Sequence, residues 1–293
     1  MPITASPGTR FQYCSRCIVL AAYVLERITG QSWEDYTRTH IYTPLGMNTA
    51  AFGPLGLAQA ADHARPYHHD TILGEVTVPW ARLQYLDPLA PAGGIDANVD
   101  EMARYPLLQL GDGTIFGHRV VTAEMLAELH RPEIAVGADW TPAASVENLH
   151  YALGWFTADA RGLHLVRHNG ANPGFRASIV LVPSFKTAVV ILTNGESDLF
   201  TDAANYSLLE QLAWARMRSR RSDPGIKLII FPKSASACEE PLAKRAEGAP
   251  DNLGRDPTGG SGWFAAGRFT GHDVVKPDIR FIVPAWSKQR QPL

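Results

Sequence analysis

The strongest constraint on the fold is a series of four apolar segments between residues 150 and 195, joined by very short connections. From Phe175 to Leu181 every second residue is apolar, and this period of two is that of a strand. The four expected strands are Tyr151 to Ala158, His164 to His168, Phe175 to Pro183 and Thr187 to Asn194. The connections Asp159 to Gly162, Gly170 to Gly174 and Pro183 to Lys186 are too short to cross over to a parallel neighbour. We therefore expect an antiparallel meander.

Helical patterns precede and follow this sheet. The segment from Cys17 to Ile28 has the broad apolar pattern of a buried helix, and Gly30 stands where a left-handed cap is expected. Capping residues start three more helices: one from Ser32 to about Ile41, closed by Pro44 and Gly46; one from Asn98, which Pro106 would kink or end; and one from Thr122 to Leu129. A closing helix is expected over Asp202 to Met217. Helices, then an antiparallel sheet, then a last helix predict an α+β fold.

The charge balance predicts a boundary near residue 216. Residues 1–216 hold 14 Lys and Arg against 21 Asp and Glu, whereas residues 217–293 hold 13 against 8. The second region also contains five of the six lysines and shows no sustained helical or strand period. We predict one folded domain over residues 1–216 and a disordered or weakly ordered tail over 217–293. Translation from a shifted frame and a small folded domain remain the alternatives for this tail.

Composition excludes several classes of function. No apolar run reaches the roughly 18 to 20 residues of a transmembrane helix, and the first residues do not form a charged and then apolar export signal. The net charge of −2 gives no reason to expect a nucleic-acid partner, and three cysteines cannot close a disulfide framework. As written, the chain is expected in the cytoplasm, or outside it if the true start lies upstream.

Several ordered motifs carry a resemblance to a known family. They are residues 7–15 (PGTRFQYCS), 44–47 (PLGM), 91–94 (PAGG), 168–175 (HNGANPGF) and 192–194 (LTN). In this order and at this spacing the chain resembles the serine β-lactamase and penicillin-binding protein family, in its branch of class C β-lactamases, D-Ala-D-Ala carboxypeptidases and esterases. The resemblance covers about residues 5–215. It implies a β-lactamase and DD-peptidase-like fold, with an antiparallel sheet flanked by helices.

The resemblance also implies roles for single residues. That family uses a Ser-x-x-Lys motif, a Tyr-x-Asn or Ser-x-Asn motif, and a Lys-Thr-Gly or His-x-Gly motif on an edge strand. Tyr13 would be the proton carrier of the second motif, and His168 would hold the substrate beside the edge strand. Ser15, Asn169 and Gly170 would contact the substrate, with Gly170 allowing close approach because it has no Cβ. Ser15 stands where the family usually has Asn, and a hydroxyl offers one donor where an amide offers two.

The first motif is absent from the sequence. The residues three positions before the six lysines are Pro183, Pro224, Ile230, Pro241, Asp273 and Ala285, so no Ser-x-x-Lys occurs. We therefore expect that this chain lacks the N-terminal part of the family and its nucleophile. If the start site is misassigned, an in-frame Ser-x-x-Lys should lie in the DNA upstream of Met1. Serine is a poor nucleophile without a base, and a tyrosine of pKa about 10 is a poor base without a nearby cation. Arg16 is the only obvious substitute for the missing lysine.

Simpler interpretations compete at each of these positions. Tyr13 would otherwise be a buried aromatic residue, His168 a hydrogen-bonded histidine at a strand edge, and Ser15 a plain helix N-cap. Cys14-x-x-Cys17 has no second pair and no histidine at zinc spacing, which disfavours a metal or redox site. A surface loop explains the cluster of His63, His68, His69 and Asp70.

The sequence therefore predicts a β-lactamase-related serine hydrolase scaffold without its nucleophile. In an intact relative, serine would attack an ester, an amide or a D-amino-acid peptide and release the acyl group to water, with neither metal nor organic cofactor. A pseudoenzyme that binds peptide or another partner is one alternative, and a gene remnant without function is another.

Overall fold

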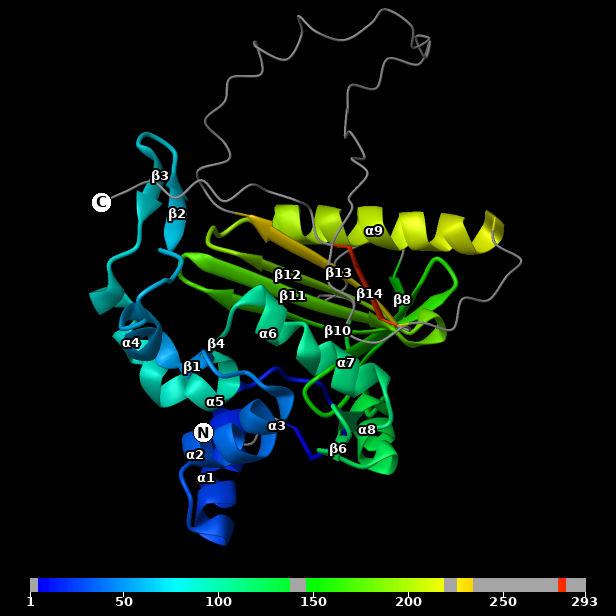
Figure 1. Ribbon diagram of the computed structural model, residues 1–293, viewed down its shortest axis with the longest axis horizontal. Coiled ribbons are helices and arrows are strands. Elements are labelled where there is room, and N and C mark those ends of the chain that lie inside the picture. The colour runs from blue at the N-terminus through cyan, green and yellow to red at the C-terminus, as the bar shows by residue number, and fades with distance from the viewer. Residues whose placement is uncertain (1–4, 138–145, 219–225, 234–278, 283–293) are drawn as a thin grey trace, which may run out of the picture.

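The computed structural model describes residues 5–137, 146–218, 226–233 and 279–282, in which helices cover both faces of one large sheet (Figure 1). The eight described strands of this sheet follow the order β14-β13-β12-β11-β10-β9-β8-β7. Their bounds are β7 Ile134–Ala135, β8 Val146–Tyr151, β9 Phe156–Ala160, β10 Leu163–Asn172, β11 Phe175–Val182, β12 Thr187–Thr193, β13 Ile226–Lys233 and β14 Ile279–Ile282. Three small two-stranded sheets pair β1 Ala51–Phe52 with β4 Ile95–Asp96, β2 Tyr67–Asp70 with β3 Gly74–Thr77, and β5 Thr114–Ile115 with β6 His118–Arg119.

The helices lie mainly before the sheet in the chain. The α-helices are α1 Ser15–Thr29, α2 Trp33–Thr37, α3 Thr43–Leu45, α4 Gly53–Ala58, α5 Ala90–Gly93, α6 Val99–Met102, α7 Arg104–Leu110, α8 Ala123–His130 and α9 Asp198–Arg218. A π-helical turn, Arg38–Tyr42, joins α2 to α3, and short 3₁₀ turns occupy Trp80–Arg82, Gln84–Leu89 and Pro183–Phe185. Helices followed by an antiparallel meander and a last helix confirm the expected α+β class.

The meander from β7 to β12 is antiparallel, as the short connections predicted. Leu163 pairs with Ala160 across a turn of two residues, Arg161 and Gly162, whose φ angles are 52° and 73°. Positive φ at both central residues matches the right-handed twist of the strands that the turn connects. Gly174, at the next hairpin, also has positive φ, and a Cβ there would overlap Pro66.

Two strand boundaries differ from the prediction. The expected strand from Tyr151 to Ala158 is divided, because β8 ends at Tyr151 and β9 begins at Phe156. Between them the chain turns at Gly154, whose φ is 81°, and the turn buries Trp155 against the sheet. The strand expected to end at His168 continues as β10 to Asn172, so that only Pro173 and Gly174 remain as the connection.

Two segments of the predicted tail extend the sheet. β13 pairs in parallel with β12, and β14 pairs in parallel with β13. These strands form although the sequence after Met217 shows no sustained strand period, because β12 presents an edge to which an apolar segment such as Ile226–Lys233 can pair. Most of the predicted tail lies outside the described residues, and the boundary near residue 216 stays a prediction.

The helix caps confirm most of the expected helix starts. Gly30 ends α1 with a φ of 72°, and Gly46 ends α3 with a φ of 66°. The side chains of Ser32, Asn98 and Thr122 accept hydrogen bonds from backbone N–H groups in the first turns of α2, α6 and α8. These bonds satisfy donors that a helix start leaves without a partner.

Pro106 does not end its helix. The chain breaks between α6 and α7 at Ala103, and α7 then continues through Pro106 to Leu110. Pro106 lies in the first turn of α7, where a backbone N–H would have no partner within the helix.

The prediction of a buried first helix was wrong. Only Ala22 is buried in α1, whereas Leu20 is 62% exposed and Ile28 is 79% exposed. An apolar pattern shows that a helix has an apolar face but not that another element covers it.

Two layers of the core lie on the two faces of the sheet, and a third cluster around Tyr42, Leu45 and Leu108 lies among the helices that precede it. Leu165, Val180 and Val189 face α9, where they pack with Leu208 and Leu209. The alternate residues of the same strands face the opposite way and pack with Ala103, Trp155 and residues of α6, α7 and α8. Figure 1 shows α9 on one side of the sheet and α6 and α7 on the other. Because successive side chains of a strand point to opposite faces, each central strand contributes to both layers.

Candidate active site

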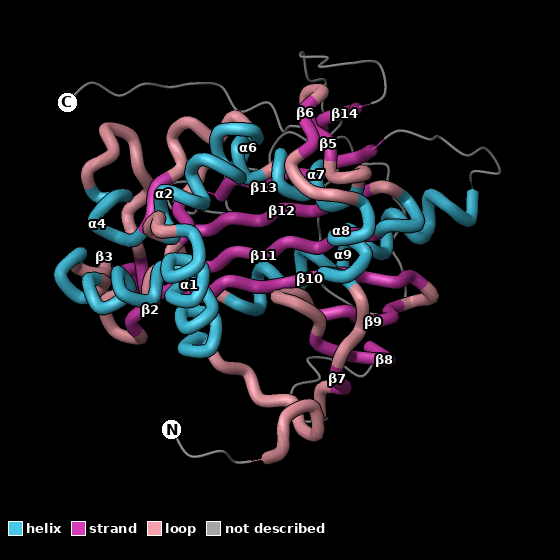
Figure 2. The backbone as a smooth tube through the Cα atoms, turned by 90° about the horizontal axis from the view of Figure 1, so that it is seen from below, coloured by secondary structure: helices cyan, strands magenta, loops and turns pink. Residues whose placement is uncertain are grey.

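The structure brings Tyr13 and His168 together, although they are far apart in the sequence. Tyr13 lies in the extended segment before α1, and its ring centroid is 6.0 Å from that of His168 on β10. Figure 2 shows this N-terminal segment running toward the β7 and β8 edge of the sheet. The rings of Phe11, Tyr151 and Phe156 complete what we call the aromatic cluster. These contacts hold the two residues of the expected site side by side.

One ring nitrogen of His168 forms a hydrogen bond with the backbone. Its Nδ1 lies 2.7 Å from the carbonyl oxygen of Asn169, and a carbonyl can only accept, so Nδ1 carries the proton. Burial lowers the pKa of His168, which favours the neutral ring at neutral pH. A neutral ring protonated at Nδ1 leaves Nε2 as an acceptor. His168 can therefore accept a hydrogen bond from a ligand, but its neutral ring supplies no positive charge.

Tyr13 is protonated in this environment. Burial raises its pKa, and burial together with the nearby Tyr13 raises the pKa of Tyr151 to about 12. Desolvation disfavours a phenolate because the charged form loses the most hydration. At neutral pH the phenol of Tyr13 can donate or accept a hydrogen bond, but it is a weak base.

The strand that carries His168 has an unpaired edge beside the aromatic cluster. β9 pairs with β10 only up to Arg167, whereas β11 pairs with β10 as far as Asn172. Among the described residues, the stretch from His168 to Asn172 thus has a partner strand on one side only. Hydrogen-bonding groups alternate along an antiparallel strand, and the two hairpin turns place those of Asn169 and Ala171 toward the unpaired side.

Gly170 and Asn172 fix the form of this edge. A Cβ on Gly170 would lie 3.3 Å from the Cβ of Ala177 on β11, so the neighbouring strand also favours a small residue there. The Asn172 side chain donates a hydrogen bond of 2.9 Å to the carbonyl of Gly93 at the end of α5. This bond ties the end of β10 to the Pro91–Gly94 segment that takes part in the resemblance.

Asn169 points to the other face of the sheet. The hydroxyl of Ser178 donates to the Asn169 side-chain oxygen over 3.0 Å and accepts from the Asn205 amide of α9 over 2.8 Å. Ser178 and Asn205 are both buried. The side chain of Asn169 thus belongs to a hydrogen-bond network that links β10, β11 and α9, while its backbone lies on the unpaired edge. Sequence reasoning missed this network because its members come together only when α9 packs on the sheet.

Ser15 is the first residue of α1, and Cys14 holds the N-cap position. The expectation that Ser15 caps the helix was therefore wrong by one residue. Cys14 and Cys17 form a disulfide across the first turn of α1, with their Cα atoms 5.4 Å apart. The substrate roles predicted for Ser15, Asn169 and Gly170, and the catalytic roles predicted for Tyr13 and His168, stay predictions.

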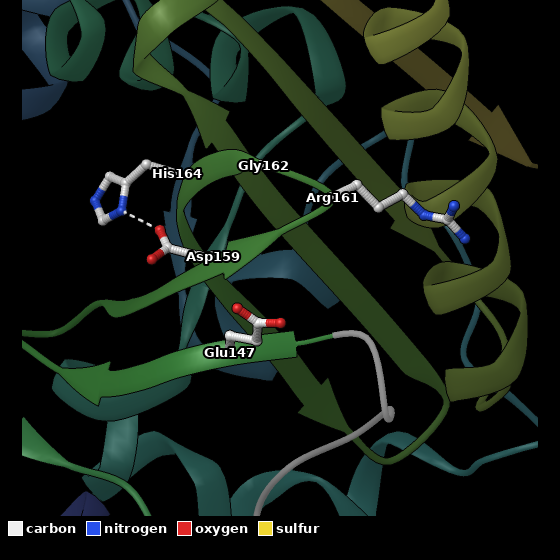
Figure 3. A pocket seen from close by; sticks show the side chains of 5 residues that line it. All are labelled: Glu147, Asp159, Arg161, Gly162 and His164. Carbon is white, nitrogen blue, oxygen red and sulfur yellow. Dashed lines mark hydrogen bonds and ion pairs between the residues drawn. The ribbon is translucent and has the colours of Figure 1, made fainter.

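A second group of polar residues lines an open pocket of about 470 Å³ near the other end of β10 (Figure 3). Its lining residues are Glu147, Asp159, Arg161, Gly162 and His164. His164 Nδ1 lies 3.0 Å from the Asp159 carboxylate, and the Asn148 amide donates to the same carboxylate. His164 precedes His168 by four residues, which is about 13 Å along a strand. The sequence did not indicate this pocket, because its residues meet through the hairpin of β9 and β10.

The histidine cluster expected in a surface loop lies in and before a hairpin. His68, His69 and Asp70 are in β2, and His69 contacts Glu75 of β3 on the exposed side. Asp70 accepts two backbone hydrogen bonds in the turn that follows, which explains its lowered pKa.

Within the described residues, no group of three potential ligands could hold a metal ion. The same part of the chain contains no helix that is both long and apolar enough to span a membrane.

Comparison with known proteins assigns the family. The model of the beta-lactamase family matches residues 1–213, so the chain belongs to this family. The suspected resemblance is confirmed.

Individual relatives agree with this assignment. Penicillin-binding protein 4 of Amycolatopsis lactamdurans is 30% identical over 218 residues, which cover 72% of this chain and 54% of that protein. An unguisins hydrolase of Aspergillus campestris is 30% identical over 206 residues, 66% of this chain and 35% of that protein. The D-amino acid amidase of Ochrobactrum anthropi SV3, solved in complex with L-phenylalanine, superposes with a TM-score of 0.56 at 16% identity, covering 72% of this chain and 62% of that one. The likeness to the amidase confirms the fold. The chain spans a little over half the length of the penicillin-binding protein and about a third of the length of the unguisins hydrolase.

Proposed function

We propose that this chain binds small ester, amide or D-amino-acid peptide substrates along the unpaired edge of β10, and that it does not hydrolyse them on its own. The observation that carries the proposal is the meeting of Tyr13 and His168 beside this edge. Both are motif residues of a hydrolase family, and both reach the same place from distant parts of the chain.

Binding would use the backbone first. An extended ligand can add to a strand edge through main-chain hydrogen bonds, and the groups of Asn169 and Ala171 face the unpaired side. The absent side chain of Gly170 would let the ligand lie close to the strand. Nε2 of His168 would accept a hydrogen bond from a ligand N–H, and the aromatic cluster would contact an apolar side chain.

Turnover would need groups that this chain does not combine. A serine must lose its proton to a base as it attacks, and donors must face the developing oxyanion. The sequence has no Ser-x-x-Lys, and the raised pKa of Tyr13 keeps its phenol protonated, so that Tyr13 is a poor base for a serine. Ligand binding without acyl transfer follows from this set of groups.

The substrate class rests on the relatives. One is named as a hydrolase of unguisins, one as a penicillin-binding protein, and the solved neighbour as a D-amino acid amidase. An amide with an aromatic side chain, such as D-phenylalanine amide, therefore makes a suitable probe.

Binding and turnover are tested separately. We expect D-phenylalanine amide to bind with a Kd on the order of 1 mM, measured by ligand-observed NMR, because few groups contact a ligand of this size. His168→Ala should weaken binding about tenfold, as expected for the loss of one buried hydrogen bond and a ring contact. Hydrolysis of a p-nitrophenyl ester should equal the rate in buffer.

His164→Ala is the matched control, because it removes a histidine from the same strand outside the aromatic cluster. Equal binding by the parent and His168→Ala would contradict the binding site. Ester hydrolysis with a covalent adduct on a residue of this chain would contradict the absence of turnover.

A further inference from the structure

The first turn of α1 contains a feature that substrate binding does not explain. Cys14 is the N-cap of a helix of 15 residues, Cys17 is the third residue of that helix, and a disulfide joins them. The backbone N–H of Cys17 also donates to the carbonyl of Cys14 over 3.0 Å. A bond that closes so short a loop restricts the unfolded chain little, so it adds little to the stability of the fold.

This disulfide is accessible and lies at the positive end of the helix dipole. Cys17 is exposed, Cys14 is half-buried, and no acidic residue occupies the first turn of α1. Arg16 lies between the two cysteines in the sequence. Helix N-terminal N–H groups and a neighbouring cation both stabilise a thiolate, which makes it a better leaving group in thiol–disulfide exchange.

The same bond lies within the motif of the candidate site. Cys14 directly follows Tyr13 and directly precedes Ser15, and Tyr13 contacts His168 and two further rings of the aromatic cluster. The disulfide restricts the backbone at Cys14, through which the extended segment enters α1. A change at this bond must therefore act on the residue that orients Tyr13.

We propose that Cys14 and Cys17 form a redox-active disulfide that exchanges electrons with an external dithiol, and that its opening moves Tyr13 relative to His168. The redox chemistry does not depend on any ligand bound at β10. The disulfide would thus react with a substrate of a different class, a small or protein dithiol. The oxidation state of the disulfide would control the geometry of the candidate site at β10.

The exchange proceeds in two steps. A thiolate of the dithiol attacks Sγ of Cys17, the bond between the two cysteines breaks, and Cys14 leaves as a thiolate at the helix N-terminus. The second thiolate of the reductant then attacks the other sulfur of the same dithiol, which is bonded to Cys17 in the mixed disulfide, and Cys17 leaves as a thiolate. The dithiol leaves as a disulfide, two electrons pass to the protein, and its two protons end on the two cysteines.

The redox couple is tested in a Cys238→Ser background, which leaves only the two cysteines of α1. The protein is equilibrated with mixtures of reduced and oxidised dithiothreitol, and the free thiols are alkylated and counted by mass spectrometry. We expect a reversible transition in which both thiols appear together. Two thiols at every ratio, or a disulfide that dithiothreitol does not open without denaturant, would overturn the proposal.

The coupling to the candidate site is read from the imidazole Cε1–H resonance of His168, assigned through its loss in His168→Gln. Reduction should shift this resonance and leave that of His164 in place, with an unchanged far-UV circular dichroism spectrum. Cys17→Ser should show the shifted position at every redox ratio, and the parent titration gives the same information if this variant does not fold. A His168 resonance that is identical in both redox states would disprove the coupling.

Discussion

Burial gives Asp96 a property that its sequence context does not suggest. Asp96 ends the two-residue strand β4, opposite Ala51 of β1, and its Oδ2 is buried without a hydrogen-bond partner in the described part of the chain. Burial, with a smaller contribution from Asp87, raises its pKa to about 7. A carboxyl group with a raised pKa binds its proton more tightly in the folded than in the unfolded chain, so its ionisation opposes folding.

The first prediction concerns the pH dependence of stability. Between about pH 4, where the unfolded carboxyl ionises, and about pH 7, where the folded one does, the contribution of Asp96 to the free energy of unfolding should fall as the pH rises. One pKa unit corresponds to about 1.4 kcal/mol, so the loss from this group is at most about 4 kcal/mol. Asp96→Asn should remove this loss and be more stable than the parent at pH 8, as measured by urea unfolding at pH 5 and pH 8.

Asp62→Asn, which changes an exposed carboxyl to an amide, provides the comparison. The prediction would be wrong if the stability of the parent chain rose between pH 5 and pH 8 and Asp96→Asn followed the same curve. Ionisation of Asp96 would then not lower the free energy of unfolding.

Motif reasoning located Tyr13 and His168 but not the groups around them. The spacing of two motifs sufficed to place these residues at one site, since the fold brings both to the edge of β10. The hydrogen bond from His168 Nδ1 to the Asn169 carbonyl follows from a local ring orientation, which no sequence pattern specifies. The buried contact between Ser178 and Asn205 depends on how α9 lies on the sheet, and residue types alone do not determine that position.

At the scale of elements, local patterns predicted strands better than they predicted burial. The strands β11 and β12 lie within one residue of their expected ends, because alternation and short breaker-rich turns are local signals. The division between β8 and β9 was missed because Gly154 was taken as part of a strand, although glycine often marks a turn. The exposure of α1 depends on which elements reach it, and this is not local.

The exposed face of α1 leads to the second prediction. Leu20, Val24 and Ile28 recur every four residues and lie on one side of the helix in contact with solvent. A contiguous apolar face promotes association in water. We expect the parent chain to self-associate through this face and Leu20→Gln combined with Ile28→Gln to shift it toward the monomer in sedimentation velocity. Thermal stability should change little, because these side chains are exposed in the folded chain.

Ile72→Gln combined with Leu73→Gln tests whether the effect belongs to α1. These two residues are also highly exposed, but they lie at the tip of the β2 and β3 hairpin. An equal loss of association in both double variants, or none in the α1 variant, would contradict a specific role for α1.

At the scale of the whole molecule, one sheet supports both core layers and the candidate site. Val180 packs toward α9 and Leu181 toward α6 and α7, while β10 carries His168 on its unpaired extension. Displacing α9 would expose one layer and also remove Asn205 from the network that reaches Asn169. The candidate site should therefore depend on the packing of α9, although α9 contributes no residue to the aromatic cluster.

The last prediction tests this dependence. Leu208 of α9 is 8% exposed and packs on the sheet, whereas Leu199 in the first turn of the same helix is 84% exposed. Leu208→Ala should lower the free energy of unfolding by about 2 to 4 kcal/mol, because it leaves a cavity in the core, and Leu199→Ala by less than about 0.5 kcal/mol. Urea unfolding followed by circular dichroism measures both. Equal effects of the two substitutions would show that α9 does not stabilise the sheet through this face. Leu208→Ala should also weaken the binding of D-phenylalanine amide, and binding at the parent affinity would contradict the dependence of the site on α9.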